Sequence, residues 1–435
     1  MRHVRAETVD RVTREVRERI GPAVAEVFER CFVDTLESAV GTAPDGTAFV
    51  VTGDIPAMWL RDSTAQLAPY LHFLADDDLL ADTVAAVSRR QLACILLDPY
   101  ANAFNRFDNG NGHSDDLTEQ SGWVWERKYE IDSLCYPLQL AHDLWRATGR
   151  TDHLGEFAAA LTAAIRVIRT EQDHEAASPY RFQRTDCPPS DTLVRDGRGS
   201  LVAPNGLSWS AFRPSDDACE LGYNIPGNAF AVVALTMAAE LARDVLDEPG
   251  LAAEAEELAE RIDDAIRSEA IVTDATGRAI LAYEIDGLGA DVRMDDSNVP
   301  SLLSLPIVGW CAADDPLYLA TRAFVLSDQN PYFARGTAAT GLGSPHTPPD
   351  TIWPIGLAIQ GLTALTTDEK RDVLDTLLRT DAGTGFMHES FHKDDPTVFT
   401  REWFSWANAM FCELVLDVAG LRTLIRQPQP VGADR

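Results

Sequence analysis

Apolar residues recur at three- and four-residue spacing along most of the chain, a spacing typical of helices with one buried face. Strand-like segments are few and short, at 48–54 and in an expected hairpin of 270–274 with 279–284. With the charged N-terminal stretch included, the pattern indicates roughly a dozen helices. The other predicted helices are 22–40, 64–75, 81–97, 130–149, 153–172, 228–246, 251–270, 316–327, 351–365, 367–380 and 403–421.

The order of these elements bears on the domain organisation. No linker rich in Pro, Gly or Ser divides the chain, and no alternation of strands with helices indicates a parallel sheet. Consecutive helices with long connections predict antiparallel helix pairs in a ring or solenoid. We therefore expect an all-α fold in which residues 1–425 form one domain and 426–435 form a frayed C-terminal tail.

Composition and charge narrow the possible partners. The 435 residues are 45% hydrophobic and 24% charged, which excludes general disorder. The net charge of −31 repels nucleic acids and anionic membranes, so neither is expected as a partner, whereas sugars remain plausible. The N-terminus lacks the apolar stretch of a signal peptide, and the longest apolar run, 229–239, is too short to cross a bilayer. The seven cysteines are widely spaced, so we expect free thiols and a cytoplasmic location.

Polar and aromatic residues concentrate in the connections between helices. If the helix pairs form a ring, these connections meet at one end of it, where aromatic faces can stack on sugars while Asp, Arg and His bind hydroxyls. The alternative is that the aromatic residues only close the end of the core. The segments concerned are 53–64, 98–105, 123–132, 209–228, 294–301, 341–349 and 383–406.

Paired carboxylates in these connections are candidates for acid–base chemistry. Asp216 and Asp217 follow Arg213 and Pro214, and a carboxyl among apolar neighbours gains the raised pKa that a general acid needs. On spacing alone either aspartate could be that acid, or the pair could form a helix cap or a solvated turn, as Asp295–Asp296 also could. Candidates for its partner carboxylate are Asp62, Glu389, Asp394, Asp395 and Glu402.

The segment His388-Glu389-Ser390-Phe391-His392 matches the H-E-x-x-H pattern of zinc hydrolases. That geometry requires a helix, and the glycines and proline around the segment leave little room for one. His346 is the one candidate for a third ligand. A loop glutamate flanked by sugar-binding histidines would have the same letters without a metal, so zinc remains the weaker alternative.

Eight blocks together resemble glycoside hydrolase family 125, the exo-acting α-1,6-mannosidases. They are GDIPAMWLRDST, DPYANAFN, WVWERKYEID, FRPSDDACELGY, MDDSNVPSLLSLP, GLGSPHTP, GTGFMHESFH and FTREWFSW. The resemblance runs from about residue 25 to about residue 418. It implies an (α/α)6 barrel of six helical hairpins with minor β-hairpins in its loops. It also implies an inverting hydrolase without metal or cofactor, which removes terminal non-reducing mannose from mannose-containing oligosaccharides.

The same resemblance implies roles for individual residues. Asp216 matches the general acid and Glu389 the general base, with Asp217 in a supporting role. The residues implied to hold substrate are Trp59, Arg61, Asp62, Glu130, Arg213 and His346. One departure is NIPGN at 224–228, where a bulkier residue and no glycine are expected, so a reshaped pocket wall is predicted there.

The implied mechanism is a single displacement. Asp216, protonated in the resting enzyme, donates to the glycosidic oxygen, and ionised Glu389 takes a proton from the attacking water. Inversion requires the two carboxyl groups to lie roughly 6.5–9.5 Å apart. A sugar epimerase or isomerase on the same toroid, a non-catalytic sugar-binding protein and the zinc hydrolase remain as alternatives. The sequence carries no signal for an oligomeric state.

Overall fold

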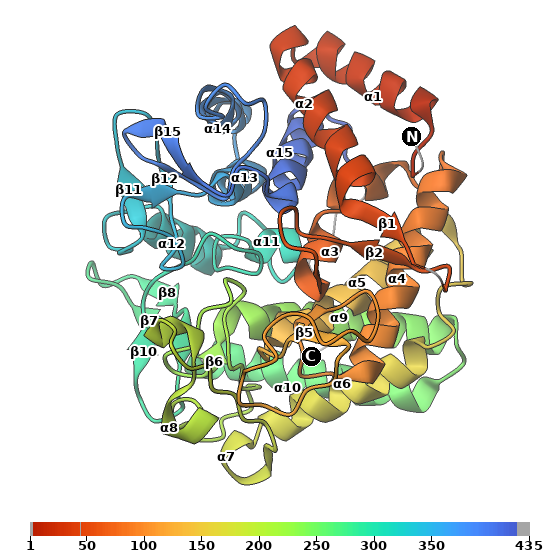
Figure 1. The fold of residues 1–435 in the computed structure, drawn as a ribbon. Coiled ribbons are helices and arrows are strands. Elements are labelled where there is room, and N and C mark those ends of the chain that lie inside the picture. The colour runs from red at the N-terminus through yellow and green to blue at the C-terminus, as the bar shows by residue number, and fades with distance from the viewer. Residues whose placement is uncertain (1–2, 44, 424–435) are drawn as a thin grey trace.

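The computed structural model describes residues 3–43 and 45–423, so the expected tail at 426–435 lies outside the described residues. Within them, an inner ring of six helices is surrounded by six outer ones, which is the (α/α)6 barrel expected from the sequence (Figure 1). The inner helices are α3 (Leu60–Ala65), α5 (Ile131–Thr148), α9 (Ile225–Asp244), α11 (Leu305–Val308), α13 (Pro354–Leu362) and α15 (Ser405–Val418). The outer helices are α2 (Pro22–Asp34), α4 (Asp78–Leu97), α6 (Phe157–Glu171), α10 (Pro249–Glu269), α12 (Pro316–Val325) and α14 (Thr367–Arg379).

The remaining helical elements lie outside the two rings. They are α1 (Ala6–Arg19), α7 (His174–Ala177) and α8 (Val194–Gly197), with a π-helical turn η1 (Thr35–Ala39) and the 3-10 turns η2 (Ala68–Phe73) and η3 (Pro189–Asp191).

Sequence decides which helices are inner. Outer helices such as α10 and α14 carry charged residues on one face and bury the other, whereas α9 and α15 are apolar on all sides and almost wholly buried. Among the described residues α9 alone is long and apolar enough to cross a bilayer, which the shorter run at 229–239 did not show. Because 89% of its apolar window is buried inside the protein, α9 fits a core helix.

The last inner helix closes the ring against the beginning of the chain. α15 contacts α13, α3 and α2. Arg19 donates a hydrogen bond to the Ala419 carbonyl at 2.8 Å, and Gly53 forms a β-bridge with Phe404. Gly53 has a φ of +137°, and a Cβ there would lie 2.5 Å from the Trp403 carbonyl oxygen, so this closure requires glycine.

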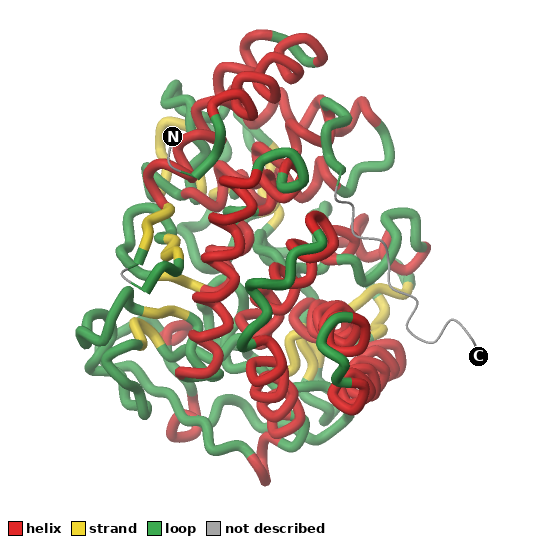
Figure 2. Tube along the Cα trace, turned by 90° about the vertical axis from the view of Figure 1, so that its right-hand side faces the viewer, coloured by secondary structure: helices red, strands yellow, loops and turns green. Residues whose placement is uncertain are grey.

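Short antiparallel strands hold the connections in place, and most lie on the left-hand side of Figure 2, the face seen in Figure 1. In three sheets one strand runs directly into an inner helix: β3 into α3, β6 into α9 and β13 into α13. These sheets are β3 (Met58–Trp59), β4 (Ala103–Phe104) and β5 (Val124–Glu126); β6 (Tyr223–Asn224), β9 (Glu284–Ile285) and β10 (Asp291–Val292); and β13 (Thr351–Ile352), β14 (Ser390–His392) and β15 (Asp395–Thr400). The two-stranded sheets are β1 (Val40–Thr42) with β2 (Ala48–Val50), β7 (Ile271–Thr273) with β8 (Ala279–Leu281), and β11 (Phe333–Arg335) with β12 (Thr340–Leu342).

Most predicted elements are confirmed, including the β7–β8 hairpin, with boundaries moved by a few residues. The single helix predicted at 64–75 is wrong. α3 ends at Ala65, and the 3-10 turn η2 follows, with Pro69 near its start. The helix predicted at 22–40 ends at Asp34 and continues as the π-helical turn η1.

Candidate active site

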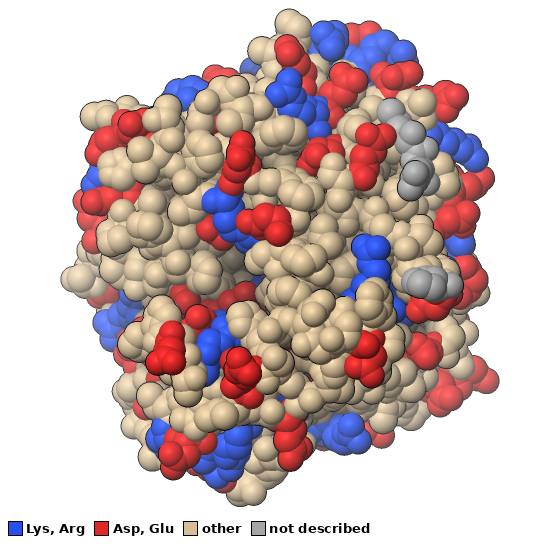
Figure 3. Space-filling view, viewed as in Figure 1, with Lys and Arg blue, Asp and Glu red and all other residues tan. Residues whose placement is uncertain are grey.

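One pocket opens where the inner helices begin. Trp59, Trp353 and Phe404 are the N-cap residues of α3, α13 and α15, so the positive ends of these helix dipoles point toward it. A space-filling view shows a hollow near the middle of this face, with charged side chains of both signs around it (Figure 3). The lining residues are Thr52, Ile55, Trp59, Arg61, Asp62, Pro214, Ser215, Asp216, Asn298, His346, Trp353, Glu389, Arg401, Phe404 and Trp406.

Asp216 projects into the pocket from a tight turn. Its N–H donates to the Arg213 carbonyl at 2.9 Å, and the Arg213 N–H donates to the Asp217 carbonyl at 2.7 Å. Pro214 suits the second position of such a turn, and Asp216 takes a φ of +67°, a region that aspartate tolerates better than most residues. The Lys128 ammonium donates to the Asp216 carbonyl at 2.8 Å, which fixes the turn to the β5–α5 connection.

The Arg61 guanidinium, 3% exposed, holds the Asp216 carboxylate. One nitrogen donates to Asp216 at 2.7 Å, and another donates to Glu130 at 2.6 Å and to Asp132 at 3.2 Å. Burial raises the pKa of Asp216, but Arg61, a hydrogen bond with Glu130 and Lys128 lower it by more, so the pKa lies well below its usual range. The direction of this shift favours an ionised Asp216, in contrast to the protonated form expected from the sequence.

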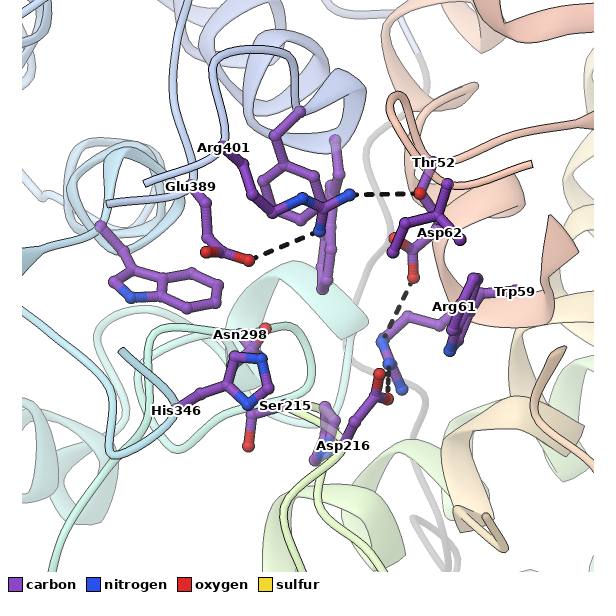
Figure 4. A pocket seen from close by; sticks show the side chains of 15 residues that line it. Thr52, Trp59, Arg61, Asp62, Ser215, Asp216, Asn298, His346, Glu389 and Arg401 are labelled. Carbon is purple, nitrogen blue, oxygen red and sulfur yellow. Dashed lines mark hydrogen bonds and ion pairs between the residues drawn. The ribbon is translucent and has the colours of Figure 1, made fainter. Parts of the chain in front are cut away.

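Glu389 lies on another side of the pocket, just before β14 (Figure 4). β14 pairs with β15 so that Ser390 faces Thr400, and this register brings Arg401 beside Glu389 at 3.4 Å. Arg401 has a φ of +44°, forms an ion pair with Asp54, and lies over the Phe404 ring at 4.3 Å. The β14–β15 hairpin thus pairs Glu389 with Arg401, whereas Asp216 is paired with Arg61.

Only some of the five carboxylates proposed as partners of the acid line the pocket. Asp394 and Asp395 are exposed and accept hydrogen bonds from Thr337 and Thr397, and Glu402 is exposed as well. Glu389 and Asp62 are the two of this group that line the pocket. Burial raises the pKa of Asp62 to about 6, with Asp216 adding to the effect and Arg61 and Arg401 opposing it.

His346 completes the arrangement between the two sides. Its Nδ1 lies 3.3 Å from a carboxylate oxygen of Asp217, so Asp217 supports the site through His346 and not through the Arg61 cluster. Burial lowers the pKa of His346, but its hydrogen bond with Asp217 and the charges of Asp216 and Glu389 outweigh this and raise it to about 9. The imidazole is therefore cationic at neutral pH.

The whole arrangement can be compared with known proteins. The family model described as "Metal-independent alpha-mannosidase (GH125)" matches residues 21–416. The chain belongs to glycoside hydrolase family 125. This enzyme is thus a glycoside hydrolase of the α-mannosidase type, as the sequence blocks implied.

Individual relatives agree with this assignment. A metal-independent α-mannosidase structure from Streptococcus pneumoniae, in a non-productive complex with α-1,6-mannobiose, is 51% identical, with a TM-score of 0.95 and coverage of 97% of this chain and 100% of that one. The "Meiotically up-regulated gene 157 protein" of Schizosaccharomyces pombe is 37% identical over 95% of this chain and 86% of its own. A bacterial glucoamylase structure with acarbose shares the fold at a TM-score of 0.62 and 15% identity, covering 93% of this chain and 57% of that one.

Two residues expected to hold substrate in this α-mannosidase do not line the pocket. Glu130 is fully buried behind Arg61. Arg213 pairs with Glu284 at 2.5 Å and lies over the Tyr283 ring, so it fixes the turn that carries Asp216. Trp59, Arg61, Asp62 and His346 do line the pocket, together with Asp216 and Glu389.

The unusual glycine in the 224–228 segment also lies outside the pocket lining. Asn224 caps α9 by accepting from the Gly227 N–H at 2.8 Å. A Cβ on Gly227 would lie 2.6 Å from the Ile131 side chain, so glycine permits close approach of α9 to α5. The expected change in the pocket wall is therefore a change in helix packing.

The H-E-x-x-H segment is not the helix that a zinc site needs. Ser390 to His392 form strand β14, and the His388 ring stacks on Phe399 at 3.8 Å. The two His388 nitrogens already contact the Glu402 carbonyl at 3.1 Å and the Thr384 hydroxyl at 3.4 Å. Over residues 3–43 and 45–423 no group of three or more His, Cys, Asp and Glu side chains could hold a metal ion.

Sequence reasoning missed Arg401 and Asn298 as pocket residues. Both lie in blocks that carried the family resemblance, FTREWFSW and MDDSNVPSLLSLP, so the blocks themselves were the available signal.

Asp295 caps the turn before α11 by accepting from the Leu302 and Leu303 N–H groups at 2.8 and 2.9 Å, as expected of a cap.

Proposed function

We propose that this α-mannosidase is exo-acting on α-1,6 linkages and inverts the anomeric configuration. The observation that carries the proposal is that Asp216 and Glu389 line one pocket from different elements, each with its own arginine. This suits one carboxyl for the leaving oxygen and the other for a water. The complex of the Streptococcus pneumoniae relative with α-1,6-mannobiose supports the linkage.

The proposed reaction transfers two protons. Asp216 gives a proton to the glycosidic oxygen as its bond to C1 breaks, and the shortened glycan leaves as an alcohol. Water attacks C1 from the opposite face while Glu389 takes a proton from it, which yields β-mannose. Glu389 then releases its proton to solvent and Asp216 regains one, so the enzyme is restored.

The rest of the pocket suits the terminal sugar. Trp59, Trp353 and Phe404 offer aromatic faces for the C–H side of a pyranose, and Asp62 and His346 offer hydrogen bonds to hydroxyls. Behind them the Arg61 cluster is buried, which supports an exo mode in which one terminal residue enters. An uncharged sugar is also not repelled by the strongly negative net charge of the enzyme.

Proton NMR of the enzyme with α-1,6-mannobiose tests this proposal, with the anomeric signals followed from the first minutes. We expect β-mannose to appear before mutarotation produces the α anomer. Early α-mannose would contradict inversion, and cleavage of α-1,2- or α-1,3-mannobiose in preference to the α-1,6 isomer would contradict the linkage. An interconverted monosaccharide without cleavage would favour an epimerase instead.

We also propose a cytoplasmic location. All seven cysteines are free, and six of them are buried, which suits a reducing compartment. Fractionation of the source cells with an antibody to the protein tests this, and recovery from the medium would contradict it.

A further inference from the structure

The cluster around Arg61 holds more negative than positive charge. Four carboxylates surround this one guanidinium: Glu130, Asp132 and Asp216 at 2.6 to 3.2 Å, and Asp62 at 3.6 Å. The side chains of Glu130 and Asp132 are 0% and 1% exposed. Ionised groups buried to this degree are costly unless each is paired, so a cluster with one cation favours keeping a proton.

Neighbouring cations do not supply the missing charge. The Lys128 ammonium lies 2.6 Å from Asp191 and 3.7 Å from Glu126. Arg401 pairs with Asp54 and Glu389. His346 likewise has Asp217 as its own partner. Each of these cations already has at least one carboxylate outside the cluster, so a bound proton can supply compensation beyond that of the positive N-terminal ends of α3 and α5.

The contacts of Glu130 indicate where that proton lies. Its Oε2 accepts from Arg61 and from the Ser133 hydroxyl at 2.9 Å, whereas its Oε1 is buried without any N–H or O–H partner. Glu130 is the N-cap residue of α5, yet its side chain caps no backbone N–H. The carboxyls of Glu130 and Asp216 lie on two nitrogens of the same Arg61 guanidinium, and the nearby Asp216 raises the pKa of Glu130. A proton on Oε1 would turn this unpartnered oxygen into a donor and reduce the repulsion between the two carboxyls.

We propose that Glu130 holds the acid's proton before a glycan binds and passes it to Asp216 when one binds. Glu130 is thus a positioning residue that acts through Asp216 and does not touch the sugar. In the transfer, the O–H bond on Glu130 breaks and one forms on Asp216, so protonated Glu130 and ionised Asp216 become ionised Glu130 and protonated Asp216. Asp216 then protonates the glycosidic oxygen, and solvent reprotonates the pair after the products leave.

The environment of the two groups favours this order. Burial and the nearby Asp216 raise the pKa of Glu130 well above its usual range despite the opposing effect of Arg61. The Asp216 side chain is 23% exposed, so a bound sugar would remove water from it. Loss of that water disfavours the ionised form of Asp216 and so moves the proton toward the leaving oxygen.

Two substrates separate proton supply from sugar binding. α-1,6-Mannobiose needs a protonated leaving oxygen, whereas fluoride leaves α-mannosyl fluoride with far less help. We expect Glu130→Gln to lower kcat on mannobiose by about 10²-fold and on the fluoride by only a few-fold, with KM little changed, because general acid catalysis is worth about 10²–10⁴-fold. The alkaline limit of the mannobiose pH profile should move to lower pH, since Asp216 beside Arg61 alone holds its proton weakly.

Asp132→Asn is the matched control. It removes another buried carboxyl from the same guanidinium, but one that, unlike Glu130, leaves no buried oxygen without a partner. Its losses on the two substrates should be equal, because it affects only the placement of Arg61. Equal losses for Glu130→Gln as well, or an alkaline limit that does not move, would overturn the proposal.

Isotope-edited infrared spectroscopy locates the proton without a Glu130 variant. The wild-type enzyme should show a protonated-carboxyl band that shifts when glutamate carries ¹³C and that disappears in Asp216→Asn, whose amide can donate to Glu130. A protonated-carboxyl band that shifts only with labelled aspartate would place the proton on an aspartate and not on Glu130, and would overturn the inference. The inference rests on the proposed function, but wild-type enzyme inactive on mannobiose would refute that function while leaving the infrared result intact.

Discussion

Each side of the pocket places carboxylates around one arginine, but the two sides differ in how many carboxylates that arginine contacts. On the acid side, Arg61 is 3% exposed and touches four carboxylates, so the site holds excess negative charge and retains a proton. On the base side, Arg401 is 22% exposed and pairs with two carboxylates, Asp54 and Glu389, so the excess of negative charge is smaller and solvent can screen it. The comparison indicates that the ratio of carboxylates to arginines, more than the burial of one group, would separate the two proposed roles.

Replacing Asp216 and Glu389 one at a time is the strongest test of the two proposed roles. We expect Asp216→Asn and Glu389→Gln each to lower kcat on α-1,6-mannobiose by about 10³-fold or more, since each removes one proton transfer. On α-mannosyl fluoride, Asp216→Asn should keep most of its activity while Glu389→Gln stays inactive.

Melting curves provide the control for these two variants, because both substitutions keep the size of the side chain. Near-normal turnover of mannobiose by either variant, with an unchanged Tm, would show that the roles are assigned to the wrong residues.

Arg401 should matter for the base side alone. Arg401→Gln removes the guanidinium at 3.4 Å from Glu389, so we expect kcat/KM to fall by about 10-fold or more on mannobiose and on the fluoride equally, because the base is misplaced. Arg335→Gln is a suitable control, since Arg335 pairs with exposed Asp328 outside the pocket. A loss confined to mannobiose would link Arg401 to the acid.

His346 gives a smaller effect that depends on pH. Its pKa is raised to about 9 in the folded protein, so its pairing with Asp217 stabilises the fold fully below the unfolded pKa of about 6.5 and is lost as pH rises through about 9. The His346 side chain is 37% exposed, so the contribution should be about 1 kcal/mol or less. Thermal unfolding of His346→Gln should show a lower Tm than wild type at pH 6 and none of this difference near pH 10.

Metal removal should have no effect. The His388 ring stacks on Phe399, and its nitrogens contact Thr384 and Glu402, so it is not free to bind zinc beside Glu389. Dialysis against EDTA should leave kcat on mannobiose unchanged, and His392→Asn should do the same. Activity lost in EDTA and restored by zinc would contradict this reading of the H-E-x-x-H segment.

Long amphipathic helices such as α10 and α14 could be predicted from sequence because their polar and apolar faces alternate with the helical period. α3 could not, since all six of its residues are buried, Arg61 and Asp62 among them, and leave no polar face to detect. Strands of two or three residues, such as β3 and β14, are likewise too short for a period.

The residues of the site could be predicted only where they stand in the sequence blocks that carry the family resemblance. Asp216 and Glu389 stand in such blocks, and both line the pocket. Spacing alone could not show that Arg61 would sit on Asp216 and hold its pKa down, because this contact joins residues 155 positions apart. Glu130 lies 69 positions from Arg61, so its burial was hidden as well, and it looks like any other loop carboxylate in WVWERKYEID.

The closure of the ring by α15 also has a consequence for biosynthesis. The acid side consists of residues that leave the ribosome early, whereas Glu389 and Arg401 come near the end of the chain. The ion pair of Arg401 with Asp54 joins residues 347 positions apart, and contacts that distant form late and slowly in folding. The proposed base can therefore be completed only after nearly the whole chain has been synthesised, and we expect hydrolytic activity to be the last property that the molecule acquires.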